Sequence, residues 1–230
     1  MPNLSLRLNT IASLVPFGAR VCDIGTDHGY LSIELKSSGK ASFVIAADIN
    51  PLPLKNAAEN IKKMGVTGIE LRLCDGLSCI DKDEVDTIII AGMGGEVISG
   101  ILEKGSLVAK NNKTIILQPT TSPEFLRKFL YTNGYEIEQE IPVLENGKLY
   151  SVMLVHPTDN VAQKEDYFYY IGKLSPDDST GLLYIQKQLK RCLKCAESLK
   201  NITAKQEEYL YYKNIIIGIE NYINNHLSED

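Results

Sequence analysis

Two glycines and two acids lie close together between residues 21 and 31, which read Val-Cys-Asp-Ile-Gly-Thr-Asp-His-Gly-Tyr-Leu. The apolar start, the acid Asp23 and the glycines predict a buried strand, a tight turn and the beginning of a helix. Gly25 and Gly29 permit a sharp turn and a close approach of a ligand to the backbone, because neither carries a Cβ. A strand, turn and helix in this order is where open α/β sheets bind nucleotides.

Three acids come at the ends of three successive predicted strands: Asp23, Asp48 and Asp75. Because the carboxyl ends of parallel strands lie along one edge of a sheet, we expect these acids on the same edge. Asp48 is placed to accept both ribose hydroxyls of a nucleoside, and Asp75 to accept from an adenine amino group. Asp23 would repel a pyrophosphate at the glycine turn, but it suits the amino-acid end and the sulfonium of S-adenosylmethionine. The alternative is that the acids only cap helices.

The elements that must position these residues alternate along the chain. Apolar runs predict strands over residues 43–47, 69–73, 85–91 and 114–117, and helical spacing predicts helices over 51–64, 96–103 and 123–131. This alternation predicts a parallel, doubly wound sheet.

Two further strand-like runs, at 135–143 and 149–156, are joined by a short link that contains Asn146-Gly147. Asn-Gly is a hairpin signal, and so short a link requires antiparallel pairing. A parallel sheet that ends in one reversed strand is the arrangement of S-adenosylmethionine-dependent methyltransferases, whereas a standard dinucleotide-binding sheet is parallel throughout.

The two ends of the chain have helical patterns. Near the start, apolar residues spaced three and four apart over 4–15 predict a helix that leaves Arg7 off its apolar face, as a solvated cation or as a contact for an anionic substrate. Near the end, a coiled-coil-like seam comprises Leu182, Ile185, Leu189, Cys192, Ala196 and Leu199, and a second helix covers about 205–226. We therefore predict a sheet domain at 1–157 and a helical domain at 158–230.

Four cations share one face of the first of these helices: Lys187, Lys190, Arg191 and Lys194. A solvated helix usually mixes charges of both signs along its face, and this one does not. The whole chain carries a net charge of -5, so any contact with phosphates would have to be local.

Composition limits the remaining choices. The 230 residues include 44% hydrophobic ones, enough for one sizeable core and a smaller appendage, and no apolar run has the length of a membrane span. Arg7 and Asn9 interrupt any signal-peptide core, so we expect a cytoplasmic protein. Cys192 and Cys195 form a Cys-x-x-Cys pair without a second pair or a nearby histidine, so we expect no metal and reduced cysteines.

Several motifs together resemble the bacterial tRNA adenine-22 N1-methyltransferases. They are Leu4-Ser-Leu-Arg-Leu8, Asp23-Ile-Gly-Thr-Asp-His-Gly-Tyr-Leu31, Asp75-Gly-Leu77, Ile90-Ala-Gly-Met-Gly-Gly95 and Leu117-Gln-Pro119. The resemblance covers the whole sheet domain, and the helical end of the chain agrees with that family's carboxy-terminal coiled-coil domain. It implies a class I, Rossmann-like methyltransferase sheet followed by this helical domain.

The resemblance also implies methyl transfer from S-adenosylmethionine to N1 of an adenine in tRNA. It predicts cofactor contacts by Asp23, Gly25, Asp48, Ile49, Asp75, Gly76, Ala91, Gly92 and Met93, and tRNA contacts by Arg7, Gly94, Gly95 and the four cations of the helix. N1 lies on the Watson–Crick edge, so the adenine must be unpaired or flipped out. Asp27 would stabilise charge on the methylated ring, and His28 or Tyr30 would orient the base or stack on it. We expect a monomer, with a dimer as the alternative.

Three other functions remain open from the sequence. A small-molecule methyltransferase would share the cofactor residues without needing the basic helix. A non-catalytic RNA-binding protein would use that helix without needing the acids and glycines on one edge. A nicotinamide dehydrogenase conflicts with Asp23 and with the terminal hairpin.

Overall fold

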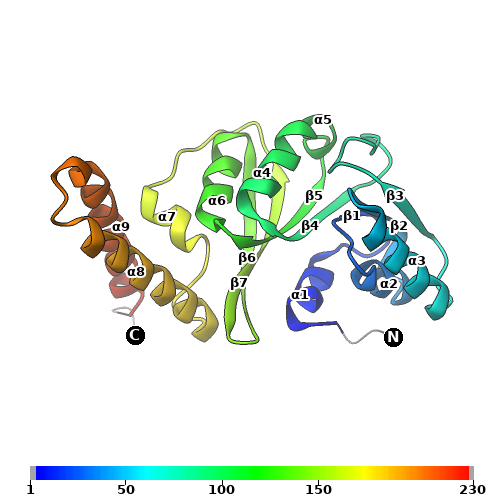
Figure 1. The fold of residues 1–230 in the computed structure, drawn as a ribbon, viewed down its shortest axis with the longest axis horizontal. Helices are drawn as coiled ribbons and strands as arrows, with labels where there is room; N and C mark the ends of the chain where they lie inside the picture. The colour runs from blue at the N-terminus through cyan, green and yellow to red at the C-terminus, as the bar shows by residue number, and fades with distance from the viewer. Residues whose placement is uncertain (1–3, 228–230) are drawn as a thin grey trace.

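A seven-stranded sheet forms the centre of the computed structural model, which describes residues 4–227 (Figure 1). The strand order is β3-β2-β1-β4-β5-β7-β6, and β7 alone runs in the direction opposite to the other six strands. The strands are β1 Ala19–Ile24, β2 Ala41–Asp48, β3 Ile69–Leu73, β4 Thr87–Gly94, β5 Thr114–Thr121, β6 Tyr135–Glu145 and β7 Lys148–Pro157. The predicted parallel sheet with one reversed strand is confirmed.

The reversal is produced by the predicted hairpin. Asn146 and Gly147 form a two-residue turn between the paired residues Glu145 and Lys148. Both turn residues have positive φ, 49° and 72°, as the tightest hairpin turns require. Asn and Gly tolerate that backbone conformation better than other residues, so the turn chemistry fixes the direction of β7.

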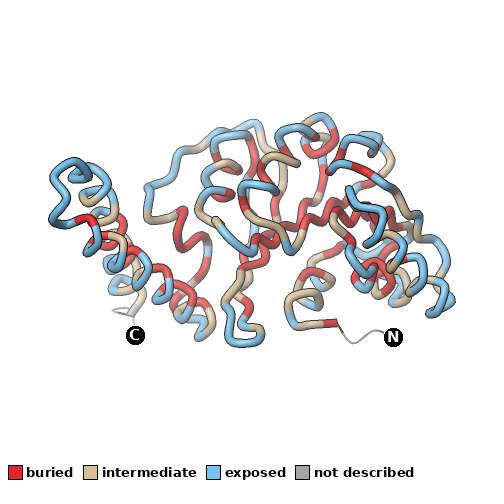
Figure 2. Tube along the Cα trace, in the orientation of Figure 1, coloured by how far each residue is buried: buried red, intermediate tan, exposed pale blue. Residues whose placement is uncertain are grey.

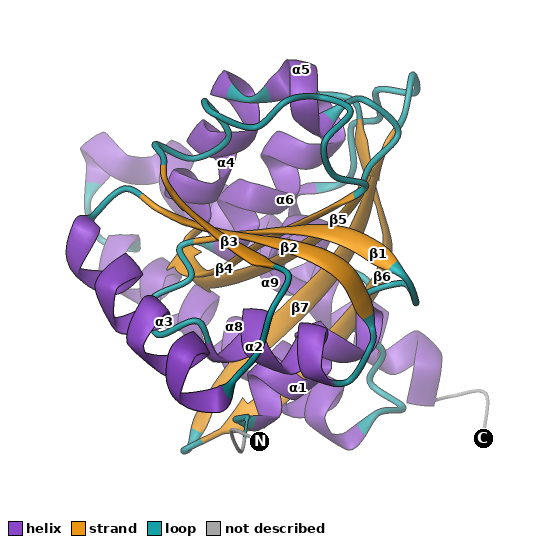
Figure 3. Ribbon diagram, turned by 90° about the vertical axis from the view of Figure 1, so that its right-hand side faces the viewer, coloured by secondary structure: helices purple, strands orange, loops and turns teal. Residues whose placement is uncertain are grey.

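Helices cover both faces of the sheet (Figure 3). Helices α1 Leu6–Leu14, α2 Tyr30–Ser37 and α3 Pro51–Met64 lie on one face, and α4 Gly95–Lys104, α5 Ser106–Ala109 and α6 Pro123–Thr132 lie on the other. Ser5 caps α1, as its place before the apolar pattern suggests, by accepting a hydrogen bond from the amide of Leu8.

The central strands are buried on both faces (Figure 2). Successive side chains of a strand point to opposite faces, so Val21 belongs to a buried cluster that includes residues of α1 and α2, while Cys22 belongs to another that includes residues of α4 and α6. This double burial explains the continuous apolar runs in the sequence.

The C-terminal part of the chain is helical: α7 Asp166–Ile171, α8 Ser179–Leu199, a 3₁₀ turn Thr203–Lys205 and α9 Gln206–Leu227. Helices α8 and α9 lie side by side at one end of the molecule (Figure 1), with Ile185 and Cys192 of α8 buried in one cluster with Ile215 and Ile219 of α9. The predicted helical hairpin is therefore present. Its coiled-coil character and a domain boundary at residue 157 remain predictions.

A buried ion pair connects the sheet to these helices. Arg127 of α6 and Glu140 of β6 have fully buried side chains, with a shortest N–O distance of 2.5 Å. Arg127 also donates to the carbonyls of Tyr169 and Tyr170 in α7 and to the hydroxyl of Tyr184 in α8. Burial alone would lower the pKa of Arg127, and the facing Glu140 carboxylate raises it overall.

Three expectations from the sequence need correction. The first is the extent of β4: the predicted strand covered residues 85–91, and the observed strand continues through Gly94 with irregular pairing to β5. The second is the region after residue 157, because the short helix α7 was not predicted: its six residues are too few to show a helical period.

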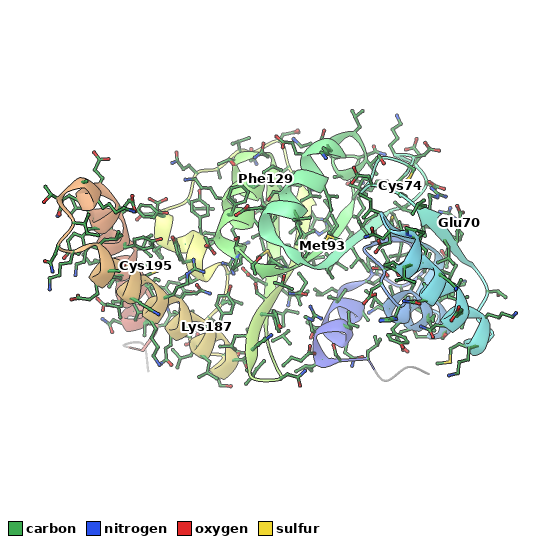
Figure 4. The ribbon with its side chains drawn as sticks, viewed as in Figure 1. Glu70, Cys74, Met93, Phe129, Lys187 and Cys195 are labelled. Atoms are coloured by element: carbon green, nitrogen blue, oxygen red, sulfur yellow. A yellow bond between two sulfur atoms is a disulfide. The ribbon has the colours of Figure 1, made fainter. Side chains whose placement is uncertain are left out.

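The third concerns the cysteines, which were all expected to be reduced. Cys74 and Cys79 form a disulfide, while Cys22, Cys192 and Cys195 are free. The turn that follows β3 brings the two Cα atoms to 5.9 Å, within the range that a disulfide spans. Figure 4 labels Cys74 at this turn.

Candidate active site

A pocket of about 380 Å³ opens at the carboxyl ends of β1, β2 and β3. Two of the three predicted acids, Asp48 and Asp75, line it, and so do Ile49, Gly76 and Met93. Carboxylates beside apolar walls suit a ligand that combines hydroxyl or amino donors with a flat apolar ring.

Gly25 forms the part of this pocket that comes directly after β1. Its φ is 79°, in the left-handed region that favours glycine. A Cβ on Gly25 would overlap the Cε atom of Met93, which lines the same pocket. The left-handed backbone favours glycine here, and a Cβ would displace the flexible end of the Met93 side chain. The contact of Gly25 with a cofactor remains a prediction. Met93 lies beside α4 in the sheet part of the molecule (Figure 4).

Asp23 is almost completely buried below this turn. Thr26 and Ser32 donate hydrogen bonds to its Oδ2 atom, at 2.9 and 2.7 Å. Burial raises the pKa of this carboxyl, although the two hydroxyl donors oppose that shift. No cation of residues 4–227 forms an ion pair with Asp23, so a positively charged ligand beside it would stabilise the ionised form.

A second pocket, of about 430 Å³, adjoins the first at Gly25, which lines both. It contains Asp23, the whole predicted catalytic turn Asp27, His28 and Tyr30, and also Arg7, Ala91, Gly92 and Tyr150. We call it the acceptor pocket. The structure thus brings the predicted catalytic residues together beside the predicted cofactor residues.

The predicted catalytic turn, Asp27 to Tyr30, presents polar groups to solvent. Asp27 has a φ of 47°, and the exposed fractions of the Asp27 and His28 side chains are 70% and 48%. His28 Nε2 lies 3.6 Å from Asp27 Oδ2, and the His28 and Tyr30 rings are stacked with centroids 5.5 Å apart. Asn60 of α3 donates to the carbonyl of His28 at 3.0 Å, which fixes the turn to that helix.

Arg7 is held from three sides, so it is not the simple solvated cation considered as an alternative. Its Nη1 donates to Gln118 Oε1 at 2.7 Å, its Nε lies 3.6 Å from Glu145, and its guanidinium lies over the Tyr150 ring at 5.2 Å. Gln118 also accepts from the amide of Gly92 at 3.2 Å. Arg7 contacts with a substrate remain a prediction.

Gln118 and Tyr150 are site residues that the sequence alone did not identify. Gln118 lies within the Leu117-Gln-Pro119 motif and is buried. A glutamine that follows an apolar run and precedes a proline is the pattern that could have identified it from the sequence. Tyr150 gave no signal, because one aromatic in a hairpin strand is ordinary.

Gly94 and Gly95 line neither of these two pockets. A Cβ on Gly94 would lie 2.9 Å from Thr121 Oγ1, and one on Gly95 would overlap the carbonyl oxygen of Ser122. These glycines let β4 and the start of α4 approach the end of β5. Their predicted contact with tRNA is untested.

The predicted basic face on α8 is reduced to three available cations. Lys187, Lys190 and Lys194 are exposed, and Figure 4 shows Lys187 in the helical part of the chain. Arg191 instead pairs with Glu124 of α6 at 2.6 Å and lies over the Tyr170 ring at 5.2 Å. We therefore keep the three lysines, and not Arg191, as predicted phosphate contacts.

Residues 4–227 contain neither a candidate membrane span nor a candidate metal cluster. None of their helices has both the length and the apolarity of a membrane span, and they contain no group of three or more His, Cys, Asp and Glu side chains that could hold a metal ion.

The fold and the paired pockets define a class I S-adenosylmethionine-dependent methyltransferase. Residues 4–153 match the methyltransferase domain family. The tRNA (adenine(22)-N(1))-methyltransferase of Bacillus subtilis is 39% identical over 172 residues, which cover 74% of this chain and 72% of that protein. The chain belongs to the tRNA (adenine(22)-N(1))-methyltransferase family.

Solved structures agree over nearly the whole chain. The crystal structure of the B. subtilis M1A22 tRNA methyltransferase TrmK has a TM-score of 0.87 at 28% identity, and covers 96% of this chain and 99% of that one. The structure of Mycoplasma capricolum TrmK in complex with S-adenosyl-homocysteine, the natural cofactor product, has a TM-score of 0.80 at 28% identity. It covers 96% of this chain and 98% of that one. The similarity therefore includes the C-terminal helices.

Proposed function

We propose that this chain transfers the methyl group of S-adenosylmethionine to N1 of adenine 22 in tRNA. The observation that carries the proposal is the junction of two pockets at Gly25, one lined by acids at strand ends and the other by the catalytic turn. The first pocket suits a methyl donor and the second suits a flat acceptor, so the two reactants would meet where the pockets join.

The first pocket fits S-adenosylmethionine in the chemistry of its lining. One oxygen of Asp48 accepts the Asn50 amide at 2.8 Å, which holds the carboxylate at the end of β2 and leaves the other oxygen for ribose hydroxyls. Ile49 and Met93 provide apolar surface for the adenine ring, and Asp75 an acceptor for its amino group. Asp23 lines the acceptor pocket, which joins the first pocket at Gly25, and no ion pair to its carboxylate occurs among residues 4–227, so it would suit the positively charged end of the cofactor where the two pockets meet. The bound cofactor supplies an electrophilic methyl group on a positively charged sulfur.

The acceptor base requires little activation. N1 of adenine has an in-plane lone pair, so the protein does not need a strong base, and catalysis consists mainly of placing N1 in line with the methyl group. Methylation leaves the ring positively charged. Asp27 lies in the acceptor pocket and would stabilise that charge, although its exposure weakens the effect.

The acceptor pocket also explains how a base could be held. N1 is inaccessible in a base pair, so the adenosine must leave its stack to enter the pocket. Tyr30 and Tyr150 provide aromatic surface for a purine, and Gly92 has no side chain that would occupy the pocket. Gln118 positions both Arg7 and the Gly92 amide, so it shapes the pocket without reaching the base itself.

The rest of the tRNA would be held elsewhere. We propose that Lys187, Lys190 and Lys194 of α8 contact phosphates, because they form an unpaired basic face on a chain of net charge -5. We also propose a monomer that acts in the cytoplasm, with its sheet and helical domains meeting near residue 157.

The test uses labelled S-adenosylmethionine and two transcripts of one tRNA, with adenosine or guanosine at position 22. We expect the labelled methyl group to enter the first transcript and not the second. Equal labelling of both would contradict the site, and labelling of neither would contradict the tRNA substrate. Loss of labelling in an Asp48→Ala variant would show that the activity belongs to this protein and not to a contaminant.

A further inference from the structure

A third pocket, of about 520 Å³, adjoins the acceptor pocket and shares no lining residue with the first pocket, the one lined by Asp48 and Asp75. It lies between the start of the chain and the end of α3. Leu8 and Tyr30 line both this pocket and the acceptor pocket, and no residue of the cofactor pocket lines it. We call it the flanking pocket. A strand that delivers a base to the acceptor pocket would therefore pass beside it.

The lining of the flanking pocket differs in charge from that of the acceptor pocket. Leu4, Leu8 and Met64 form apolar walls, and Asn60 supplies a side-chain amide. Among the described residues that line it, Lys63 is the one with a charged side chain, and it is exposed, whereas Asp23 and Asp27 line the acceptor pocket. A pocket with apolar walls and one cation suits a ligand with a flat uncharged ring linked to an anionic group, such as a base with its phosphate.

Tyr30 provides the aromatic surface that connects the two pockets. Its side chain is stacked with His28, yet the residue remains 42% exposed. Exposed aromatic side chains are the usual stacking partners of unpaired bases in single-stranded RNA. When one base leaves a helix, its neighbour in the strand loses a stacking partner, and a second aromatic contact would compensate for that loss.

We propose that the flanking pocket binds the nucleotide next to the methylated adenosine in the RNA strand. Its base packs against Leu4, Leu8, Met64 and Tyr30, and its phosphate lies at Lys63. This inference rests on the proposed function, because it assumes that an RNA base enters the acceptor pocket. It assigns the enzyme a second recognised nucleotide, held independently of the cofactor.

The test combines protein variants with abasic tRNA. Met64→Asp and Lys63→Glu alter the flanking pocket at exposed positions, and Lys62→Glu is the matched control, since Lys62 is an exposed neighbour on α3 that does not line the pocket. The tRNA substrates keep adenosine 22 and lack the base on its 5′ or its 3′ side. The measurements are kcat/KM for methylation and the Kd of S-adenosylmethionine.

With the wild-type protein, we expect one of the two abasic tRNAs to lose roughly 5- to 150-fold in kcat/KM, the range for one stacked base. Met64→Asp should lose a similar factor on intact tRNA and then show little further loss, about 2-fold or less, on that abasic tRNA. Lys63→Glu should raise KM for tRNA, while Lys62→Glu behaves like the wild type. The Kd of S-adenosylmethionine should not change in any variant.

Two results would overturn the inference. One is that neither abasic tRNA is impaired with the wild-type protein, and the other is that the abasic penalty is the same in Met64→Asp as in the wild type. Methylation of intact tRNA at adenosine 22 is measured in the same series, so a failure of the flanking pocket can be distinguished from a failure of the proposed function. If intact tRNA is methylated and the penalty is absent, only the flanking pocket is wrong. If intact tRNA is not methylated, the proposed function and the role of the flanking pocket are both wrong.

Discussion

Replacement of Arg127 by methionine should strongly destabilise the protein. The substitution removes a buried guanidinium and leaves the Glu140 carboxylate with a single recorded donor, the Lys173 amide at 3.1 Å. Breaking a buried ion pair by removing one partner costs about 3–5 kcal/mol, because the remaining charge is uncompensated. The carbonyls of Tyr169 and Tyr170 would also lose the donor that now lies 2.7 and 3.0 Å away.

This loss is large relative to the total free energy of unfolding of the protein. A domain of ordinary stability has an unfolding free energy of about 5–15 kcal/mol, so Arg127→Met should consume a large part of it. Changing Glu140 to glutamine as well removes the buried charge, so the double variant should recover a measurable part of the loss. Neutral amides are less costly to bury than an unpaired carboxylate.

Urea unfolding of the wild type, the single variant and the double variant measures these differences. The unfolding midpoints should fall in the order wild type, double variant, Arg127→Met, with similar dependence on urea. The reasoning would be refuted if Arg127→Met lost less than about 1 kcal/mol, or if the double variant were no more stable than the single one.

Four other predictions concern the site. Asp48→Ala should weaken S-adenosylmethionine binding by about 1–3 kcal/mol in calorimetry, and unchanged affinity in a folded variant would contradict the ribose contact. Asp27→Asn, which keeps a residue type that tolerates positive φ, should lower kcat about 10- to 100-fold while the Kd of the cofactor stays constant; an equal loss in both would make Asp27 structural. Burial raises the pKa of Asp23, so the folded protein without cofactor should become less stable as pH rises from the ordinary carboxyl pKa through the raised one, and Asp23→Asn should abolish this loss. Over the same pH range, cofactor affinity should rise in the wild type but not in Asp23→Asn. Calorimetry at several pH values checks both trends. Lys190→Glu with Lys194→Glu should weaken tRNA binding and reduce its salt slope by roughly 2, without changing cofactor affinity, and an unchanged slope would leave these lysines as a solvated face.

The sheet could be predicted because each of its signals is local. Apolar runs that alternate with helical patterns gave the strands, and Asn146-Gly147 gave the reversed one, since few other residues adopt its two positive φ angles. The acids were predictable for the same reason, because the carboxyl ends of parallel strands always share an edge. The position of the predicted catalytic turn followed from the same motif, since this turn comes directly after β1.

What could not be predicted depends on residues far apart in the chain. Arg191 looked available because its neighbours Lys190 and Lys194 are cations, but Glu124 pairs with it across 67 residues of sequence. Gln118 reaches Arg7 across 111 residues, and neither position signals the other. The disulfide between Cys74 and Cys79 depends on a turn whose shape the residues between them do not specify.

The central claim is methylation at N1 of adenine 22, and mass spectrometry of tRNA nucleosides tests it most directly. A tRNA transcript is incubated with the protein and isotopically labelled S-adenosylmethionine, then digested and separated. We expect labelled 1-methyladenosine from the transcript with adenosine at position 22, and none when guanosine stands there. Label in another nucleoside, such as N6-methyladenosine, or no labelled nucleoside at all would contradict it.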